Sequence, residues 1–217
     1  MDKRPEKIEK EFDTLMESIN YERVDDYINK SPDFSNADYI NVNKKIVAEL
    51  KVIDKDFFKK EGVDLQAIVP IPIDVKPNGQ GFYEFKVLKP NENIRLDTLE
   101  EPLRRIIKKA NKQLRETNEK LLNSEGVGFL ILAINMNTVI DPRIIQQLVL
   151  KFLKKEFKSI MGVIFCTPKV GPVLENGFFQ PFVLHCQDAR LSKKDEKELM
   201  FLVNSWGNFI DNDGHEN

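Results

Sequence analysis

The segment Ala37–Ile53, ADYINVNKKIVAELKVI, decides the fold because it predicts two neighbouring strands joined by a tight turn. Residues 38–42 and 45–53 are rich in β-branched side chains, and Asn43-Lys44 between them suits a two-residue loop. An asparagine in this loop tolerates the left-handed backbone conformation that such turns require. The sequence therefore predicts an antiparallel hairpin around which the rest of the chain is arranged.

The turn also predicts the register of this hairpin. If Val42 faces Lys45, then Asp38 lies directly opposite Glu49. Opposed residues of antiparallel strands share a face, with Cβ atoms roughly 4.5–5.5 Å apart, and Lys51 points to the same face as Glu49. Two carboxylates this close repel each other unless a cation lies between them, and Mg²⁺ prefers a few oxygen ligands completed by water and phosphate. We therefore expect a divalent-ion site, with Lys51 holding or deprotonating a water molecule.

These residues resemble the signature of an enzyme superfamily. Residues 37–39, ADY, followed by an apolar strand into residues 48–51, AELK, are similar to the Asp…Glu-x-Lys motif of the restriction-endonuclease-like, or PD-(D/E)xK, nucleases. The resemblance implies a phosphodiesterase that depends on Mg²⁺ or Mn²⁺, in which an acid from the first helical region, Glu17 or Glu22 here, often approaches the metal. The residues to which it assigns metal binding are Asp38, Glu49 and the carbonyl of Leu50, with Lys51 activating or orienting water.

A second Asp…Glu-x-Lys pattern occurs further along the chain. A three-residue loop at 78–80 would place Asp74 opposite Glu84, with Lys86 two residues further on. At most one of the two patterns is expected to form a site. We favour the first because apolar residues flank Glu49 as in a central strand, whereas prolines near the second pattern suit an edge hairpin. The alternative that neither pattern binds metal stays open.

Length and composition bound the class of protein. The 217 residues are 41% hydrophobic and 31% charged, which is enough for one sizeable core. A net charge of −2 provides no global basic field, so any nucleic-acid contact must come from a local cluster. Cys166 and Cys186 lack metal-binding spacing and suit buried thiols in a reducing compartment. The chain shows no apolar run that could span a bilayer and no signal peptide, so we expect a cytoplasmic protein with no membrane partner.

Hydrophobic periodicity predicts the remaining elements. The apolar run 127–134 is typical of a strand buried on both faces, and further strands are expected at 160–166 and 179–186. The expected fold class is α/β: a mixed β-sheet flanked by helices, similar to the restriction-endonuclease-like fold, in one domain spanning 1–217 with an inserted β-hairpin at about 54–96. The expected helices cover residues 5–19, 20–28 with Asn20 as the cap, 98–122, 142–157, and 192–206 closed by Gly207.

The helix predicted at 98–122 carries a second feature of interest. Its cationic side chains recur at helical spacing and form one face, the basic stripe: Arg104, Lys108, Lys112 and Arg115. Such a stripe could follow the phosphates of a nucleic acid, although a solvated face balanced by Glu116 and Glu119 fits equally well. Gln113 borders the apolar side of this helix, and the resemblance implies that it reaches the active site.

The leading hypothesis is therefore a Mg²⁺-dependent nuclease that hydrolyses phosphodiester bonds, with DNA as the expected partner. Gln113 and the basic stripe would steady the nucleic-acid backbone. One alternative is a non-catalytic protein of the same fold that binds nucleic acid or protein. Another is a structural protein in which Asp38, Glu49 and Lys51 form an exposed salt-bridge ladder. The insertion at 54–96 would carry substrate selectivity or the contact of a homodimer.

Overall fold

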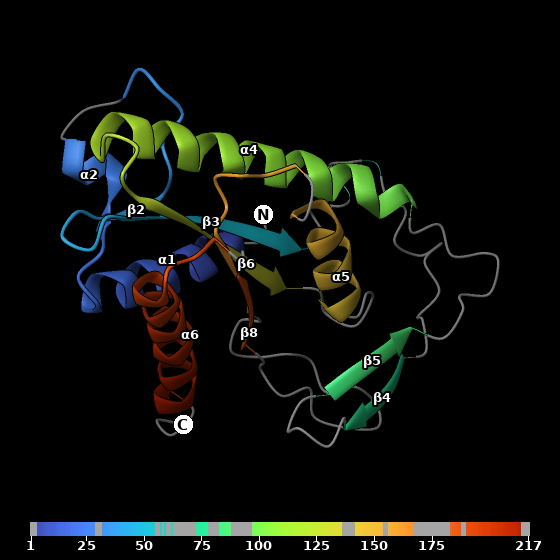
Figure 1. Cartoon of the computed structure of the whole chain (residues 1–217). Coiled ribbons are helices and arrows are strands. Elements are labelled where there is room, and N and C mark those ends of the chain that lie inside the picture. Colours follow the sequence, from blue (N-terminus) through green and yellow to red (C-terminus); the bar gives the residue numbers. More distant parts are fainter. Residues whose placement is uncertain are drawn as a thin grey trace.

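A mixed six-stranded sheet forms the centre of the protein (Figure 1). The three central strands β3, β6 and β7 run parallel, whereas the other neighbours in the sheet pair antiparallel. This confirms the predicted α/β class with a mixed sheet and flanking helices. In spatial order the strands are β1 (Glu22–Arg23), β2 (Tyr39–Asn41), β3 (Ile46–Asp54), β6 (Val127–Asn135), β7 (Gly162–Cys166) and β8 (Val183–Gln187).

The coordinates are those of a computed structural model, which describes most of the chain. The described residues are 4–28, 32–54, 57, 59, 62, 73–77, 83–87, 97–135, 142–153, 156–166, 183–187 and 190–213. Within these residues no helix is long and apolar enough to cross a membrane.

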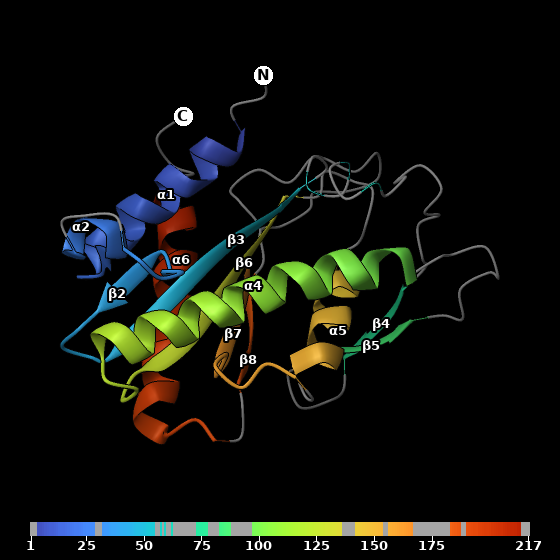
Figure 2. The same cartoon turned by 90° about the horizontal axis from the view of Figure 1, so that it is seen from above.

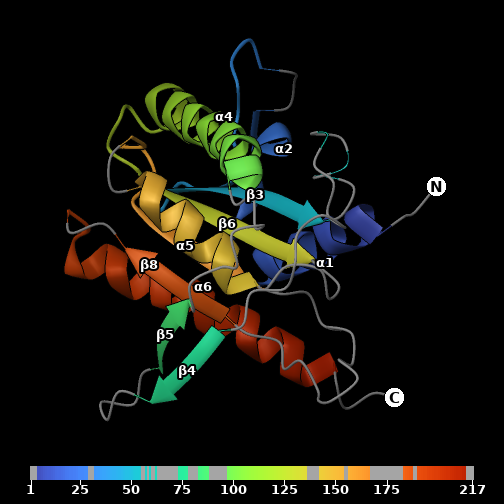
Figure 3. The same ribbon diagram turned by 90° about the vertical axis from the view of Figure 1, so that its right-hand side faces the viewer.

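Helices cover both faces of the sheet, as the view from above and the view from the side show (Figures 2 and 3). Alternate residues of β3 enter two separate cores because successive side chains of a strand point to opposite faces. Val47 packs in the core beneath α4, and Ala48 packs in the core beneath α1 and α6. The helices are α2 (Val24–Ile28), α4 (Asp97–Leu121) and α5 (Pro142–Leu153) on one face, and α1 (Arg4–Ser18) and α6 (Lys193–Asp213) on the other.

The central hairpin has the predicted register. The paired residues are Tyr39 with Ala48, Ile40 with Val47, and Asn41 with Ile46. The turn differs from the prediction, because the left-handed residue is Lys45, with φ of 55°, and not Asn43. The N–H of Lys45 donates to the carbonyl of Val42 at 3.1 Å, so residues 42–45 form the turn and β3 begins at Ile46. The register is still the predicted one, because the loop is longer than predicted by one residue on each side, which leaves the other pairs unchanged.

Three predicted helix ends were wrong. Asn20 does not cap the second helix. Instead it closes α1 in the left-handed conformation, with φ of 64°, while the N–H of Tyr21 donates to the carbonyl of Met16 at 2.8 Å. Helix α5 ends at Leu153 rather than continuing through residue 157, and α6 runs past Gly207 to Asp213.

The second acid-rich hairpin does not have the predicted register. Strands β4 (Ile73–Pro77) and β5 (Tyr83–Val87) form a two-stranded sheet of their own. Asp74 faces Lys86, and Glu84 faces Lys76. The expected opposition of Asp74 and Glu84 is therefore wrong, because the connection spans 78–82 rather than 78–80 and shifts the pairing.

Candidate functional site

Asp38, Glu49 and Lys51 come together on the α4 side of the sheet. The carboxylate of Glu49 accepts a hydrogen bond from the backbone N–H of Asp38 through Oε2, at 3.1 Å, and forms an ion pair with Lys51 through Oε1. The carboxylate of Asp38 accepts the backbone N–H of Leu50 at 2.8 Å. Asp38, just before β2, and the middle of β3 thus bring two carboxylates and one ammonium into a single connected cluster.

This cluster lies inside the protein. The side chain of Glu49 is 0% exposed and that of Lys51 is 15% exposed, while Asp38 is half-buried. An exposed salt-bridge ladder, which was one of the alternatives, is therefore excluded. A buried carboxylate next to a second carboxylate is unfavourable for stability, and such arrangements are concentrated at functional sites.

Burial changes the acidity of Glu49. Loss of solvation and, next, the negative charge of Asp38 raise the pKa of Glu49 from 4.5 to about 8, although the Lys51 ammonium and the N–H of Asp38 act in the opposite direction. Protonated and ionised Glu49 therefore both occur near neutral pH. A divalent cation at this position would favour the ionised form, which is the form that binds metal.

Gln113 of α4 also reaches the segment that carries Asp38. Its Nε2 donates to the carbonyl of Asn36 at 2.8 Å, and its Oε1 is buried without a hydrogen-bond partner in the described structure. Buried acceptors are nearly always satisfied, so the free Oε1 leaves an acceptor available to a water molecule or a ligand. Gln113 is therefore bonded to the backbone two residues before Asp38, and its predicted reach into an active site stays a prediction.

Thr117 is a neighbour that sequence analysis missed. It is 0% exposed, and its Oγ1 accepts the N–H of Ala37 at 2.7 Å. The available signal was a polar residue one turn after Leu114 on the apolar side of an amphipathic helix.

The four residues of the basic stripe are all exposed on α4. Arg104 pairs with Glu156 at 2.7 Å and lies over the Phe152 ring at 5.3 Å. The other ion pairs of the stripe stay on α4: Lys112 with Glu116 at 3.7 Å, and Arg115 with Glu116 at 3.6 Å and with Glu119 at 3.8 Å. Lys108 forms no ion pair with any residue of the described ranges. The stripe is therefore real but partly neutralised by acids, as the alternative interpretation expected.

Neither of the two acids expected from the first helical region joins the cluster. Glu17 lies on α1, on the opposite side of the sheet, and Glu22 is an exposed residue of β1. Within the described residues, no group of three or more His, Cys, Asp and Glu side chains could hold a metal ion. Two carboxylates alone still suit Mg²⁺, which usually keeps several waters and binds one or two carboxylates together with substrate phosphates. The side chains of Asp74, Glu84 and Lys86 lie outside the described part of the structure.

Comparison with known proteins found no similar protein. No protein-family model matches the chain, and neither does any curated protein or any solved structure. The site must therefore be interpreted from its own chemistry.

Proposed function

We propose that the protein is a Mg²⁺-dependent nuclease of the restriction-endonuclease-like class, which hydrolyses phosphodiester bonds in DNA. The observation that supports this proposal most directly is that Asp38, just before β2, lies together with the buried Glu49 and Lys51 of β3. A second observation that supports it is that Gln113 Oε1, on α4, is buried without a hydrogen-bond partner in the described structure.

The residues have chemically distinct roles in this proposal. Asp38 and Glu49 would bind Mg²⁺ together with the carbonyl of Leu50, and the bound ion would lower the pKa of a water molecule and stabilise charge on the phosphate. Lys51 hydrogen-bonds to Glu49, and its ammonium would orient the water that attacks phosphorus. Gln113 would accept a hydrogen bond from this water, and Arg104, Lys108, Lys112 and Arg115 would contact the nucleic-acid backbone.

A second candidate function is a non-catalytic nucleic-acid- or protein-binding module of the same fold. The complete burial of Glu49 favours it, because Lys51 already neutralises this carboxylate and no solvent reaches it. In such a protein the cluster is a structural ion pair that has no metal to bind.

Calorimetric titration with Mn²⁺, followed by a DNA cleavage assay with Mg²⁺ or Mn²⁺, separates the two functions. The nuclease proposal expects Mn²⁺ binding that Asp38→Ala or Glu49→Ala abolishes. It also expects cleavage that falls by at least about a hundredfold in Lys51→Met. Glu125→Ala is the matched control, because Glu125 forms an exposed ion pair with Lys45 in the turn of the hairpin, away from Asp38 and Glu49 in sequence. Absence of Mn²⁺ binding in the folded parent protein would reject the nuclease and leave the binding module.

A further inference from the structure

We propose that Thr117 and Glu116 are positioning residues that hold Asp38 in the geometry required for metal binding. This inference rests on the proposed function, because it concerns the same site. It follows from how the chain reaches Asp38. Residues 32–38 belong to neither a helix nor a strand, and β2 begins only at Tyr39.

Helix α4 holds three consecutive residues of this segment by its side chains. Glu116 Oε2 accepts the N–H of Ser35 at 2.9 Å, and Thr117 Oγ1 accepts the N–H of Ala37 at 2.7 Å. The carbonyl between these two amides, that of Asn36, accepts the amide of Gln113. The segment just before Asp38 is therefore anchored to α4 by bonds that do not belong to any regular element.

These anchors act on Asp38 through the backbone. Ala37 is 0% exposed and immediately precedes Asp38, whose own N–H donates to Glu49 and whose carbonyl accepts the N–H of Val24 at 3.0 Å. Loss of the Thr117 acceptor would leave the buried N–H of Ala37 without a partner, and the segment would have to move to satisfy it. Such a shift would move Asp38 relative to Glu49 and Leu50, to which its N–H and its carboxylate are bonded. Groups that orient metal ligands in this way commonly change affinity by ten- to a hundredfold.

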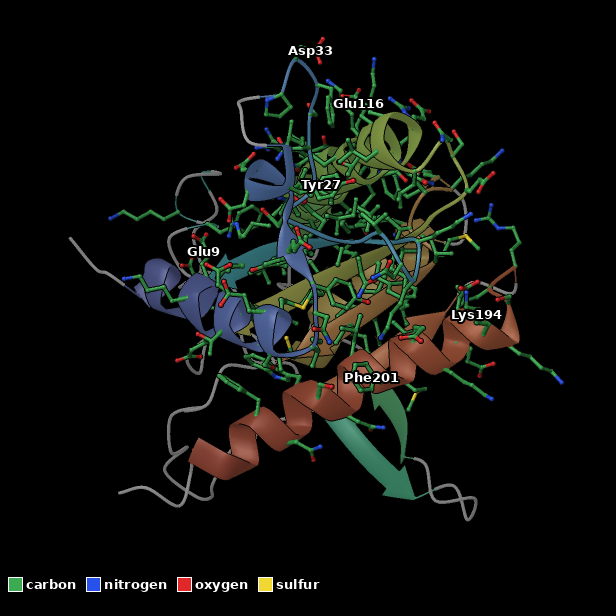
Figure 4. The ribbon with its side chains drawn as sticks, turned by 90° about the vertical axis from the view of Figure 1, so that its left-hand side faces the viewer. Glu9, Tyr27, Asp33, Glu116, Lys194 and Phe201 are labelled. Carbon is green, nitrogen blue, oxygen red and sulfur yellow. The ribbon has the colours of Figure 1, made fainter. Side chains whose placement is uncertain are left out.

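Glu116 gives this anchor a second connection. The same carboxylate that holds Ser35 lies 3.7 Å from the ammonium of Lys112 and 3.6 Å from the guanidinium of Arg115. Two members of the basic stripe therefore share an acid with the segment that carries Asp38. Figure 4 shows Glu116 on the same side of the molecule as Asp33, at the edge where the 32–38 segment passes α4.

The experiment compares Thr117→Val, which removes the acceptor at constant shape, with Thr117→Ser, which keeps it. Asn111→Ala is the matched control, because Asn111 also lies on α4 and accepts a backbone N–H at 2.9 Å, but from Ser159, which precedes β7. Two quantities are measured on the full chain: the affinity for Mn²⁺ by calorimetry and the hydrogen-exchange rate of the Asp38 amide by NMR. If Thr117→Val does not fold, Glu116→Ala, which removes the bond to Ser35 at a partly exposed side chain, replaces it in both measurements.

We expect Thr117→Val to weaken Mn²⁺ binding by roughly ten- to a hundredfold. The hydrogen-exchange rate of the Asp38 amide should rise at least about tenfold in this variant. Thr117→Ser should resemble the parent, and Asn111→Ala should lose stability without changing either quantity. Unchanged Asp38 exchange in Thr117→Val overturns the positioning role whether or not metal binds. Absence of Mn²⁺ binding in the parent rejects only the proposed function, because the exchange measurement still decides the role of Thr117.

Discussion

Glu49 is the residue in which burial and charge conflict most strongly. A carboxyl group whose pKa rises from 4.5 in the unfolded chain to about 8 in the folded protein binds its proton more tightly when folded. Its contribution to stability is therefore fully present below about pH 4.5 and is lost as pH rises through about 8. The shift corresponds to at most roughly 5 kcal/mol.

Glu49→Gln should remove this pH dependence. The amide keeps the shape of the protonated acid and does not ionise, so the variant should gain unfolding free energy relative to the parent as pH rises from about 5 to about 8. Urea unfolding at several pH values in this range measures the difference. Glu125→Gln serves as the control. Glu125 is exposed, and its ion pair with Lys45 lowers the pKa of its carboxylate, so Glu125 does not titrate between about pH 5 and 8. Parallel curves for the parent and Glu49→Gln would contradict the prediction.

The same titration should appear in metal binding. Only the ionised Glu49 binds a cation, so the apparent affinity for Mn²⁺ should rise with pH up to about 8 and then become constant. Calorimetry in buffers of different ionisation enthalpy should show release of up to one proton per bound ion at about neutral pH. Binding that is independent of pH and releases no proton would place the metal elsewhere.

The chemistry of the site was partly predictable from single residues. The opposition of Asp38 and Glu49 followed from the two-residue period of strands, which fixes the shared face once the register is known. The contact of Thr117 with Ala37 was not predictable, because it joins a helix to an irregular segment 80 residues earlier in the chain. No local pattern encodes such a contact.

At the scale of elements, the helices and strands with strong periodicity were predicted well. Helices α1 and α4 and the buried strand β6 all formed close to the expected ranges. Errors arose where a local signal competed with packing. Gly207 suggested a helix end, but the rings of Trp206 and Phe209 lie 5.8 Å apart and continue the apolar face of α6 across it. In β4 and β5 a turn rich in glycine and asparagine was compatible with several loop lengths, so the register could not be predicted.

Two glycines should respond to alanine in opposite ways. Gly207 lies within α6 with no atom close to the position of an added Cβ, so Gly207→Ala should stabilise the protein by about 0.5–1 kcal/mol. A Cβ at Gly128 of β6 would lie 2.2 Å from the carbonyl oxygen of Ser159, so Gly128→Ala should destabilise it by roughly 1–3 kcal/mol. Thermal unfolding of both variants provides the test. A loss of stability in Gly207→Ala would indicate that α6 ends at this residue.

At the scale of the whole molecule, charge decides how a nucleic acid could bind. The net charge is −2, so bulk attraction is absent and the proposed DNA binding would depend on a local group of cations, for which the exposed basic stripe of α4 is the candidate. Helix α6 offers a comparison, because Lys193 and Lys194 are exposed at its start on the opposite side of the sheet, as the position of Lys194 in Figure 4 illustrates. Changing two lysines to glutamine alters the net charge equally on either helix.

The double variant Lys108→Gln, Lys112→Gln should therefore lose DNA affinity, whereas Lys193→Gln, Lys194→Gln should bind as the parent does. Fluorescence anisotropy over a range of salt concentrations measures both affinity and its salt dependence. The slope of log K against log salt should fall by up to about two in the α4 variant, since each phosphate contact contributes about 0.9. Equal losses in the two variants would mean that net charge, and not the α4 surface, controls binding. Unchanged affinity in both would place the nucleic-acid contact outside α4, because the two lysines removed there include the one stripe cation without an ion pair in the described chain.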